Sequence, residues 1–174
     1  MSSRKPKVES ASPQHLGGGF TAPRIARDKI RSSSELAAVF ASGHRAEKLV
    51  MAHGVFDLLH MGHVRHLEEA RSFGTALVVS VTADRFVNKG PGRPAFNQSL
   101  RAEMLAALAC VDWVVISDAQ TAESVIEVLK PDVYVKGVEY SDERADVTGK
   151  IISEREAVER NGGKIVFTHD ITFS

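Results

Sequence analysis

Short apolar runs alternate with stretches of helical spacing from residue 48 onward. The five runs lie at 49–52, 76–81, 113–116, 133–135 and 164–167. Most of them are apolar on consecutive residues rather than on alternate ones, a pattern typical of strands that are buried on both faces. The sequence therefore predicts a parallel sheet of about five strands.

Helical periodicity separates these runs. Helices are expected at 63–73, at 97–108 with Asn97 as the cap, at 121–129, at 151–160 and, before the first strand, at 34–40 with a serine cap. The regular alternation predicts an α/β fold, a doubly wound (Rossmann-like) sheet with helices on both faces. In such a fold ligands bind beyond the carboxyl ends of the strands, so the loops after Ala52, Val81, Ile116 and Val135 are expected to line one cleft.

The first 28 residues differ from the rest of the chain. They contain Ser, Pro, three consecutive glycines and several basic residues without sustained periodicity, which predicts a disordered tail at 1–28. Their composition also faintly resembles an organelle transit peptide. The remaining residues, 29–174, are enough for one folded domain with a single core.

The charge balance excludes several classes of partner. Lys+Arg and Asp+Glu both number 22, so neither nucleic acid nor an anionic membrane is an expected partner. No run approaches the roughly 18 apolar residues of a membrane span, and the N-terminus lacks the apolar core of a secretory signal, so a cytoplasmic protein is expected. The single cysteine, Cys110, lies in an apolar run and is expected to be a buried thiol rather than a nucleophile or a zinc ligand.

The segment 54–63, Gly-Val-Phe-Asp-Leu-Leu-His-Met-Gly-His, joins the first strand to its helix. The helix N-terminus offers free backbone N–H groups and a partial positive charge, and Gly54 and Gly62 allow close approach of a ligand. His60 and His63 are three residues apart at the start of the same helix, so both can face the same anion. The segment predicts a phosphate site.

Alternative roles for the histidines and glycines fit the sequence less well. His44, His53 and His66 are each expected to be ordinary, hydrogen-bonded polar groups. A zinc site at His60 and His63 lacks third and fourth ligands at suitable spacing. The glycine spacing matches neither the three-glycine dinucleotide fingerprint nor a Gly-Lys-Ser/Thr phosphate loop.

The segment 54–63 resembles the signature of the cytidylyltransferase-like nucleotidyltransferase family, which has Gly, Phe-Asp and then His-x-Gly-His. Further matches at 79–84, 89–94, 98–101, 111–115 and 135–137 are similar to the adenylyltransferase domain of bacterial heptose 1-phosphate enzymes. The resemblance covers about residues 30 to 174, and identifies 29–174 as a nucleotidyltransferase domain.

The resemblance implies roles for particular residues. His60, His63, Lys89 and Arg101 would contact the phosphates as catalytic groups, although Arg101 could instead be a solvent-exposed helix residue. The nucleotide-binding residues would be Gly54, Val55, Phe56, Asp57, Gly62, Arg93, Lys136 and Gly137. Asp57 could equally serve only to brace the loop. No protein ligand set for a metal is expected.

The implied reaction needs few specialised groups. A phosphate oxygen of the acceptor attacks the α-phosphorus of the nucleotide, and pyrophosphate leaves. Because this nucleophile is already anionic near neutral pH, the protein requires no activated serine, cysteine or dedicated base. Mg²⁺, bound mainly through substrate phosphates, is the expected cofactor.

Three functions remain in competition. The first is transfer of a nucleoside monophosphate, AMP from ATP, to a sugar 1-phosphate such as heptose 1-phosphate. The second is a CTP-dependent enzyme acting on glycerol 3-phosphate or a phospho-alcohol, and the third is a non-catalytic nucleotide-binding module. A homodimer and a fused or separate sugar kinase are further expected partners.

The C-terminus departs from the family pattern. The family has a Ser/Thr-rich, phosphate-binding stretch at the start of a C-terminal helix, and the sequence ends at Ile171–Ser174 near the position where that stretch begins. The expectation is a shortened chain or a longer natural protein rather than a naturally inactive one.

Overall fold

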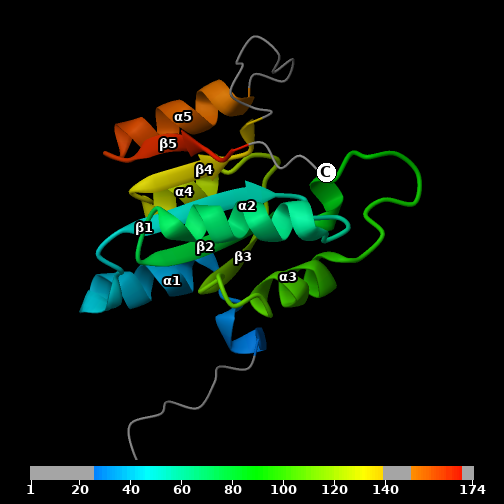
Figure 1. Ribbon diagram of the computed structural model, residues 1–174, viewed down its shortest axis with the longest axis horizontal. Helices are drawn as coiled ribbons and strands as arrows, with labels where there is room; N and C mark the ends of the chain where they lie inside the picture. The colour runs from blue at the N-terminus through cyan, green and yellow to red at the C-terminus, as the bar shows by residue number, and fades with distance from the viewer. Residues whose placement is uncertain (1–25, 139–149, 170–174) are drawn as a thin grey trace, which may run out of the picture.

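The computed structural model describes residues 26–138 and 150–169. Its centre is a five-stranded, entirely parallel sheet in the order β3-β2-β1-β4-β5 (Figure 1). The strands are β1 Leu49–Gly54, β2 Ala76–Thr82, β3 Trp113–Ser117, β4 Val133–Lys136 and β5 Lys164–Phe167. The predicted doubly wound α/β fold is confirmed.

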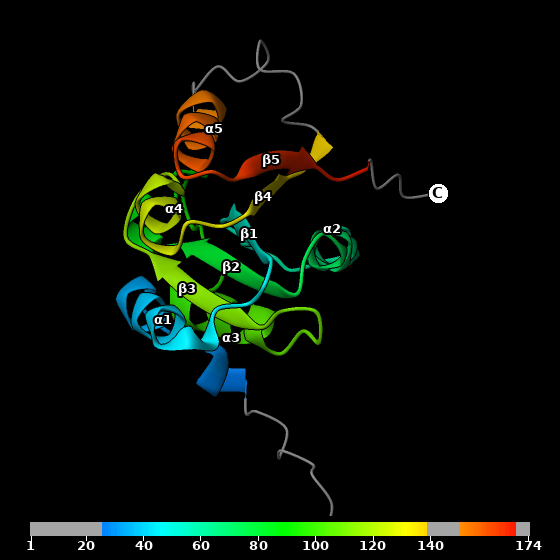
Figure 2. The ribbon, with the colours of Figure 1, turned by 90° about the vertical axis from the view of Figure 1, so that its left-hand side faces the viewer.

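Helices cover both faces of this sheet. They are α1 Ser33–Val39, α2 Met61–Ser72, α3 Gln98–Ala106, α4 Glu123–Leu129 and α5 Lys150–Arg160. Figure 2 shows α2 and α3 on one side and α1, α4 and α5 on the other. Each side has its own core, because alternate residues of a strand point to opposite faces: Val50 and Ala52 pack under α2, and Leu49 and Met51 under α4 and α5.

Two helix caps follow directly from the sequence. Asn97 accepts a hydrogen bond from the N–H of Leu100 and begins α3 as predicted. Ser32 and Glu35 form a reciprocal capping box at α1, so this helix begins slightly before the predicted Ser34. Three large apolar residues within the predicted helices are exposed, Leu100, Val128 and Ile152.

The folded part of the chain begins earlier than the composition predicts. Ala26–Lys29 form a short 3-10 helix, although the composition assigns 26–28 to the tail. Lys29 donates to the carbonyl oxygens of Leu108 and Val111, and Ile30 forms a parallel bridge with Val114 at the edge of β3. Local composition cannot predict these contacts, because they join residues that are distant in sequence. Residues 1–25 of the expected tail lie outside the described residues.

The sheet arrangement defines where ligands can bind. The strand order reverses between β1 and β4, and such a switch point opens a crevice at the carboxyl edge of a parallel sheet. In register along this edge lie Gly54 of β1, Val81 of β2 and Ile116 of β3. No helix among the described residues is long and apolar enough to cross a membrane.

Candidate active site

The two motif histidines meet at the beginning of α2. His60 is the N-cap, with an extended backbone, and its Nδ1 accepts a hydrogen bond from the N–H of Gly62 at 3.1 Å. The ring centroids of His60 and His63 are 3.9 Å apart. The first N–H groups of a helix have no intrahelical acceptor, so those of Met61 and His63 add donors beside the rings. The predicted convergence of imidazoles and N–H groups is thus present.

Phe56 shapes the turn that leads to these histidines. Its backbone is left-handed, with φ 48°, a conformation that few non-glycine residues adopt. The buried Phe56 ring lies edge-on to the His63 ring at 5.2 Å. A Cβ on Gly54 would be 3.1 Å from this ring, so a side chain there would displace it. The absence of a side chain at Gly54 therefore leaves room for the Phe56 ring in the turn.

The electrostatics of His63 favour an incoming anion. Burial, together with the positive charges of His60, His66 and Lys89, lowers the pKa of His63 to about 4, and the backbone of Leu58 opposes this shift only in part. Its Nδ1 is buried and has no hydrogen-bond partner among the described residues. An unsatisfied buried nitrogen is costly unless a ligand pairs with it.

Asp57 braces the loop that follows β2. Its carboxylate accepts hydrogen bonds from the backbone N–H of Ala95 at 2.6 Å and from Arg93 Nη1 at 2.7 Å. Burial alone would raise the pKa of Asp57, but these two contacts outweigh it and hold the pKa below its usual value. Of the two roles left open for Asp57, these contacts support the bracing role, and they pair Arg93 with a carboxylate.

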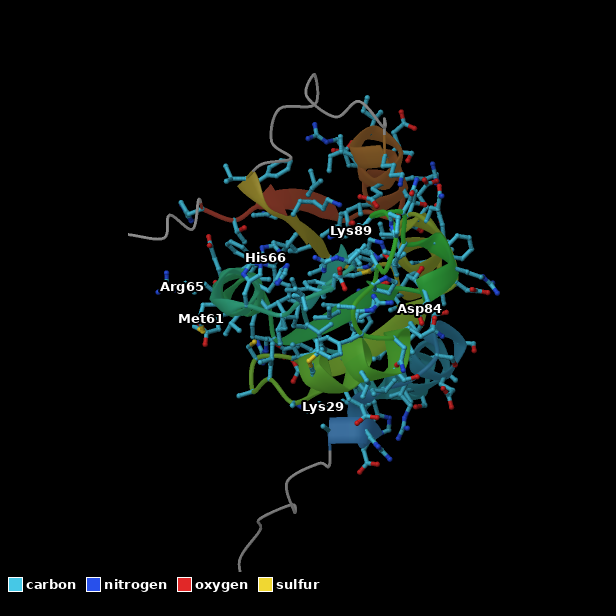
Figure 3. All side chains as sticks on the ribbon, turned by 90° about the vertical axis from the view of Figure 1, so that its right-hand side faces the viewer. Lys29, Met61, Arg65, His66, Asp84 and Lys89 are labelled. Atoms are coloured by element: carbon cyan, nitrogen blue, oxygen red, sulfur yellow. The ribbon has the colours of Figure 1, made fainter. Side chains whose placement is uncertain are left out.

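Lys89 lies on the same loop and is exposed. Its charge is close enough to lower the pKa of both His63 and Asp57. Figure 3 shows Lys89 between α2, which carries Met61, Arg65 and His66, and Asp84 beyond β2. An exposed amine beside the histidines can reach a phosphate chain, as the resemblance implies.

Arg101 is placed differently from the expectation that it contacts phosphate. Its side chain is completely buried, which also excludes a solvent-exposed role in this structure. It donates to the carbonyl oxygens of Val55, Thr82 and Phe96 and to Asp84 Oδ1, all within 3.0 Å. In this geometry it is a positioning residue, since its guanidinium joins the motif segment, the end of β2 and the start of α3.

Lys136, at the end of β4, is also held within the protein. Its Nζ lies 3.0 Å from Glu154 Oε2 of α5, and both side chains are largely buried. Glu154 also accepts from the hydroxyl of Tyr134 and from the backbone N–H of Ala122. Gly137 follows directly, at the carboxyl edge. The expected contact of Lys136 and Gly137 with the nucleotide stays a prediction.

Glu154 was missed by sequence reasoning. A signal existed, because this acidic residue lies at helical spacing with Ile151 and Val158 on the buried side of α5. A carboxylate on an apolar stripe indicates a buried cationic partner.

The three histidines expected to be ordinary polar groups are hydrogen-bonded as predicted, whereas the cysteine is less buried than expected. His44 contacts Ser42, His53 contacts Ser80 and Thr82, and His66 contacts Thr168. The thiol of Cys110 is half-buried, and desolvation raises its pKa, which disfavours the reactive thiolate.

The C-terminal end of the described chain docks on α2. Thr168 Oγ1 lies 2.9 Å from His66 Nδ1, and the backbone N–H of His169 donates to Glu69. The chain after β5 is thereby held against the helix that carries the motif histidines. The expected phosphate-binding stretch at Ile171–Ser174 lies outside the described residues.

Curated relatives match most of this chain. The bifunctional protein HldE of Geotalea uraniireducens (strain Rf4) is 46% identical over 140 residues, 79% of this chain and 27% of that protein. The chain thus spans about a quarter of the length of the curated relatives it matches.

Solved structures share the same architecture. The lipopolysaccharide core biosynthesis protein of Thermoplasma volcanium GSS1 has a TM-score of 0.57 and 30% identity, over 72% of this chain and 98% of that chain. Pantothenate synthetase from Thermus thermophilus has a TM-score of 0.55 at 16% identity, over 80% of this chain and 60% of that one, a likeness of fold alone.

The family pattern described as cytidylyltransferase-like matches residues 51–164, more than half of the 174 residues. This match begins within β1 and ends at the first residue of β5, so it contains the whole histidine segment 54–63. The chain belongs to the cytidylyltransferase-like family.

Proposed function

We propose that this domain transfers AMP from ATP to a sugar 1-phosphate such as heptose 1-phosphate and releases pyrophosphate. The observation that carries the proposal is the paired imidazoles at the N-terminus of α2, where the buried Nδ1 of His63 lacks a partner among the described residues. A phosphate chain is the ligand that helix N–H groups and imidazoles suit. The relative named for lipopolysaccharide core biosynthesis supports a sugar as the acceptor.

The reaction can proceed without a protein nucleophile. An oxygen of the acceptor phosphate forms a bond to the α-phosphorus of ATP, and the bond from that phosphorus to the bridging oxygen breaks, so the electron pair leaves with pyrophosphate. Charge increases on the departing group, and we assign its stabilisation to His60, His63, Lys89 and the N–H groups of α2. Proximity of the anion favours the protonated imidazole, and thus opposes the lowered pKa of His63.

Further residues hold these groups in position. Asp57 ties the loop of Lys89 and Arg93 to the motif segment. Arg101 fixes the carbonyl of Val55, next to the left-handed Phe56. Such preorganisation matters because an electrostatic site that must rearrange during the reaction loses much of its effect.

We propose that magnesium enters this site bound to the nucleotide. The described residues contain no group of three or more His, Cys, Asp or Glu side chains able to hold a metal ion. We propose that Mg²⁺ binds through phosphate oxygens and water, where it would neutralise part of the phosphate charge.

Two partners extend the proposal. The curated relatives are named bifunctional and are several times longer than this chain, which supports a second activity beside this domain. We propose that a sugar kinase, fused or separate, is the source of the phosphorylated acceptor. A homodimer stays a prediction.

The decisive experiment measures pyrophosphate release from the natural full-length protein. ATP and CTP are each paired with heptose 1-phosphate, with other sugar 1-phosphates and with glycerol 3-phosphate. We expect release with ATP and heptose 1-phosphate and much slower release with CTP. Release with CTP and glycerol 3-phosphate alone would replace the proposal by the cytidylyltransferase alternative. Triphosphate binding without release from any pair would support a non-catalytic module.

A further inference from the structure

Glu154 of α5 is a buried carboxylate to which the proposed reaction assigns no role. Only 2% of its side chain is exposed. Oε1 accepts from the backbone N–H of Ala122 at 3.0 Å, and Oε2 accepts from the hydroxyl of Tyr134 at 2.9 Å and from Lys136 Nζ at 3.0 Å. Both oxygens of the carboxylate therefore have partners, and one of these partners is a cation.

The pair of Glu154 and Lys136 is ionic. Burial raises the pKa of Glu154, but the charge of Lys136 and the N–H of Ala122 outweigh burial and hold the pKa below its usual value. A buried ion pair adds little net stability, because the cost of desolvation offsets the attraction. Stability alone therefore does not explain why the fold holds a lysine in this way.

Lys136 is fixed at its backbone as well as at its ammonium. Its carbonyl oxygen accepts from the backbone N–H of Thr168 at 2.9 Å. Thr168 Oγ1 lies in turn 2.9 Å from Nδ1 of His66 on α2. A lysine side chain loses rotamer entropy when it is held in one conformation. Here much of that loss has already occurred in the folded protein, before any ligand binds.

The held ammonium lies beside the switch point of the sheet. Lys136 ends β4, and the preceding Val135 is in register with Ala52 of β1, two residues before Gly54. The charges of Glu154 and Lys136 also act on His53, the residue between Ala52 and Gly54. Figure 2 shows α5 and α2 on opposite sides of the sheet. A triphosphate in the crevice between β1 and β4 would thus have Lys136 on one side and the motif histidines on the other.

We infer that Glu154 is a positioning residue for the nucleotide, which holds the ammonium of Lys136 at the crevice so that this ammonium contacts the triphosphate. The inference rests on the proposed function, which supplies the triphosphate, and extends it to a residue that acts only through Lys136. An ammonium has three N–H donors, so one can stay on Glu154 while another contacts a phosphate. In protein kinases an ion pair between a strand lysine and a helix glutamate has the same task toward ATP.

Glu154→Gln tests this role with little change of shape. The amide oxygen can still accept from the N–H of Ala122, and the amide nitrogen can donate to the hydroxyl oxygen of Tyr134. No carboxylate oxygen remains to hold Lys136. The double variant Lys136→Met/Glu154→Gln removes both members of the pair and so leaves no buried charge without its partner.

Glu127→Gln is the matched control. Glu127 also joins α4 to α5 through an ion pair, with Arg160, but both side chains of this pair are exposed. The control therefore removes a carboxylate from the same helix pair without changing the crevice.

The measurements are calorimetric titration with ATP and Mg²⁺, pyrophosphate-release kinetics and urea unfolding, all on the full-length protein. We expect Glu154→Gln to raise Kd and KM for ATP about tenfold, because the ammonium must now be ordered by the ligand, and to leave KM for the sugar 1-phosphate unchanged. Glu154→Gln should also be less stable, because it leaves the Lys136 ammonium without its buried partner. Glu127→Gln should bind ATP like the wild-type protein.

The double variant separates positioning from stability. It should recover the stability that Glu154→Gln loses and still bind ATP about tenfold more weakly than the wild-type protein, because the contact with phosphate is absent. Unchanged ATP affinity in Glu154→Gln, recovery of ATP affinity together with stability in the double variant, or an equal rise in both KM values would overturn the inference and leave the proposed function standing. The expected pattern of ATP affinities without pyrophosphate release from the wild-type protein would refute the proposed reaction and leave the role of Glu154 standing.

Discussion

His63 combines partial burial, an unpaired nitrogen and contact with a second imidazole. Removal of its ring by His63→Ala should lower kcat/KM for pyrophosphate release by about 10² to 10³, the typical cost of losing one donor from a preorganised site. The fold should persist, because the mutation removes a costly unsatisfied group. Steady-state kinetics and circular dichroism provide the measurement. His44→Ala, at an exposed residue, is the matched control, and an unchanged rate for His63→Ala would remove this residue from the site.

His53 makes the stability of the domain depend on pH. Burial lowers its pKa to about 4 from an ordinary 6.5. The unfolded chain therefore binds more protons between these values, so the free energy of unfolding falls as pH falls from about 6.5 to about 4. At pH 5 the free energy of unfolding should be about 2 kcal/mol lower than at neutral pH because of His53 alone. Urea unfolding across this range measures the effect.

A variant isolates this contribution from those of other groups. His53→Gln can still contact Ser80 and Thr82 but does not titrate. Its unfolding free energy should fall less steeply between pH 6.5 and 4.5, by up to about 1.4 kcal/mol per pH unit. Parallel slopes for the variant and the wild-type protein would contradict the buried, neutral state of His53.

Arg101 connects elements that are distant in sequence. Its loss should therefore lower the stability of the domain and disturb each of these elements. Arg101→Met would leave the carbonyls of Val55, Thr82 and Phe96 without their donor, at a cost of about 2 to 4 kcal/mol in unfolding free energy. Turnover should also fall, since the motif segment is no longer fixed. Urea unfolding and kcat/KM are the measurements.

Arg27→Met is the comparison, because Arg27 also contacts α3 but through an exposed pair with Glu103. Loss of the Arg27–Glu103 pair should lower the free energy of unfolding by less than about 1 kcal/mol. If Arg101→Met were as stable as Arg27→Met, the structural role assigned to the buried guanidinium would be wrong.

Individual elements were largely predictable from local sequence because their signals are local. The consecutive apolar residues of β1 and β2, the Asn97 cap and the strand-to-helix position of His60 each indicate their structure within a few residues. The pairing of Lys136 with Glu154 and the burial of Arg101 were not predictable, because they depend on how α5 and α3 pack on the sheet. In the structure both side chains make internal contacts, Lys136 with Glu154 and Arg101 with Asp84, and their contact with a nucleotide stays a prediction.

The whole molecule places two sets of polar groups along one edge of one sheet. The histidines and Lys89 lie near the end of β1, and Asp84, Gln98 and Asp118 lie beyond β2 and β3. The grouping of His60, His66 and Lys89 around His63 explains why a balanced total charge is compatible with local attraction for phosphates.

Binding of a triphosphate should therefore stabilise the whole domain. At a ligand concentration of 100 times Kd, the gain is about 2.7 kcal/mol, which corresponds to a rise in Tm of about 5 to 10 °C for a domain of this size. ATP with Mg²⁺ should produce this shift, and adenosine should produce little, because the expected contacts are with phosphates. The double variant His60→Ala/His63→Ala should lose most of the shift in a thermal unfolding experiment. An equal shift in that variant would mean that the triphosphate binds elsewhere, since no other pair of imidazoles in the described chain lies at a helix N-terminus.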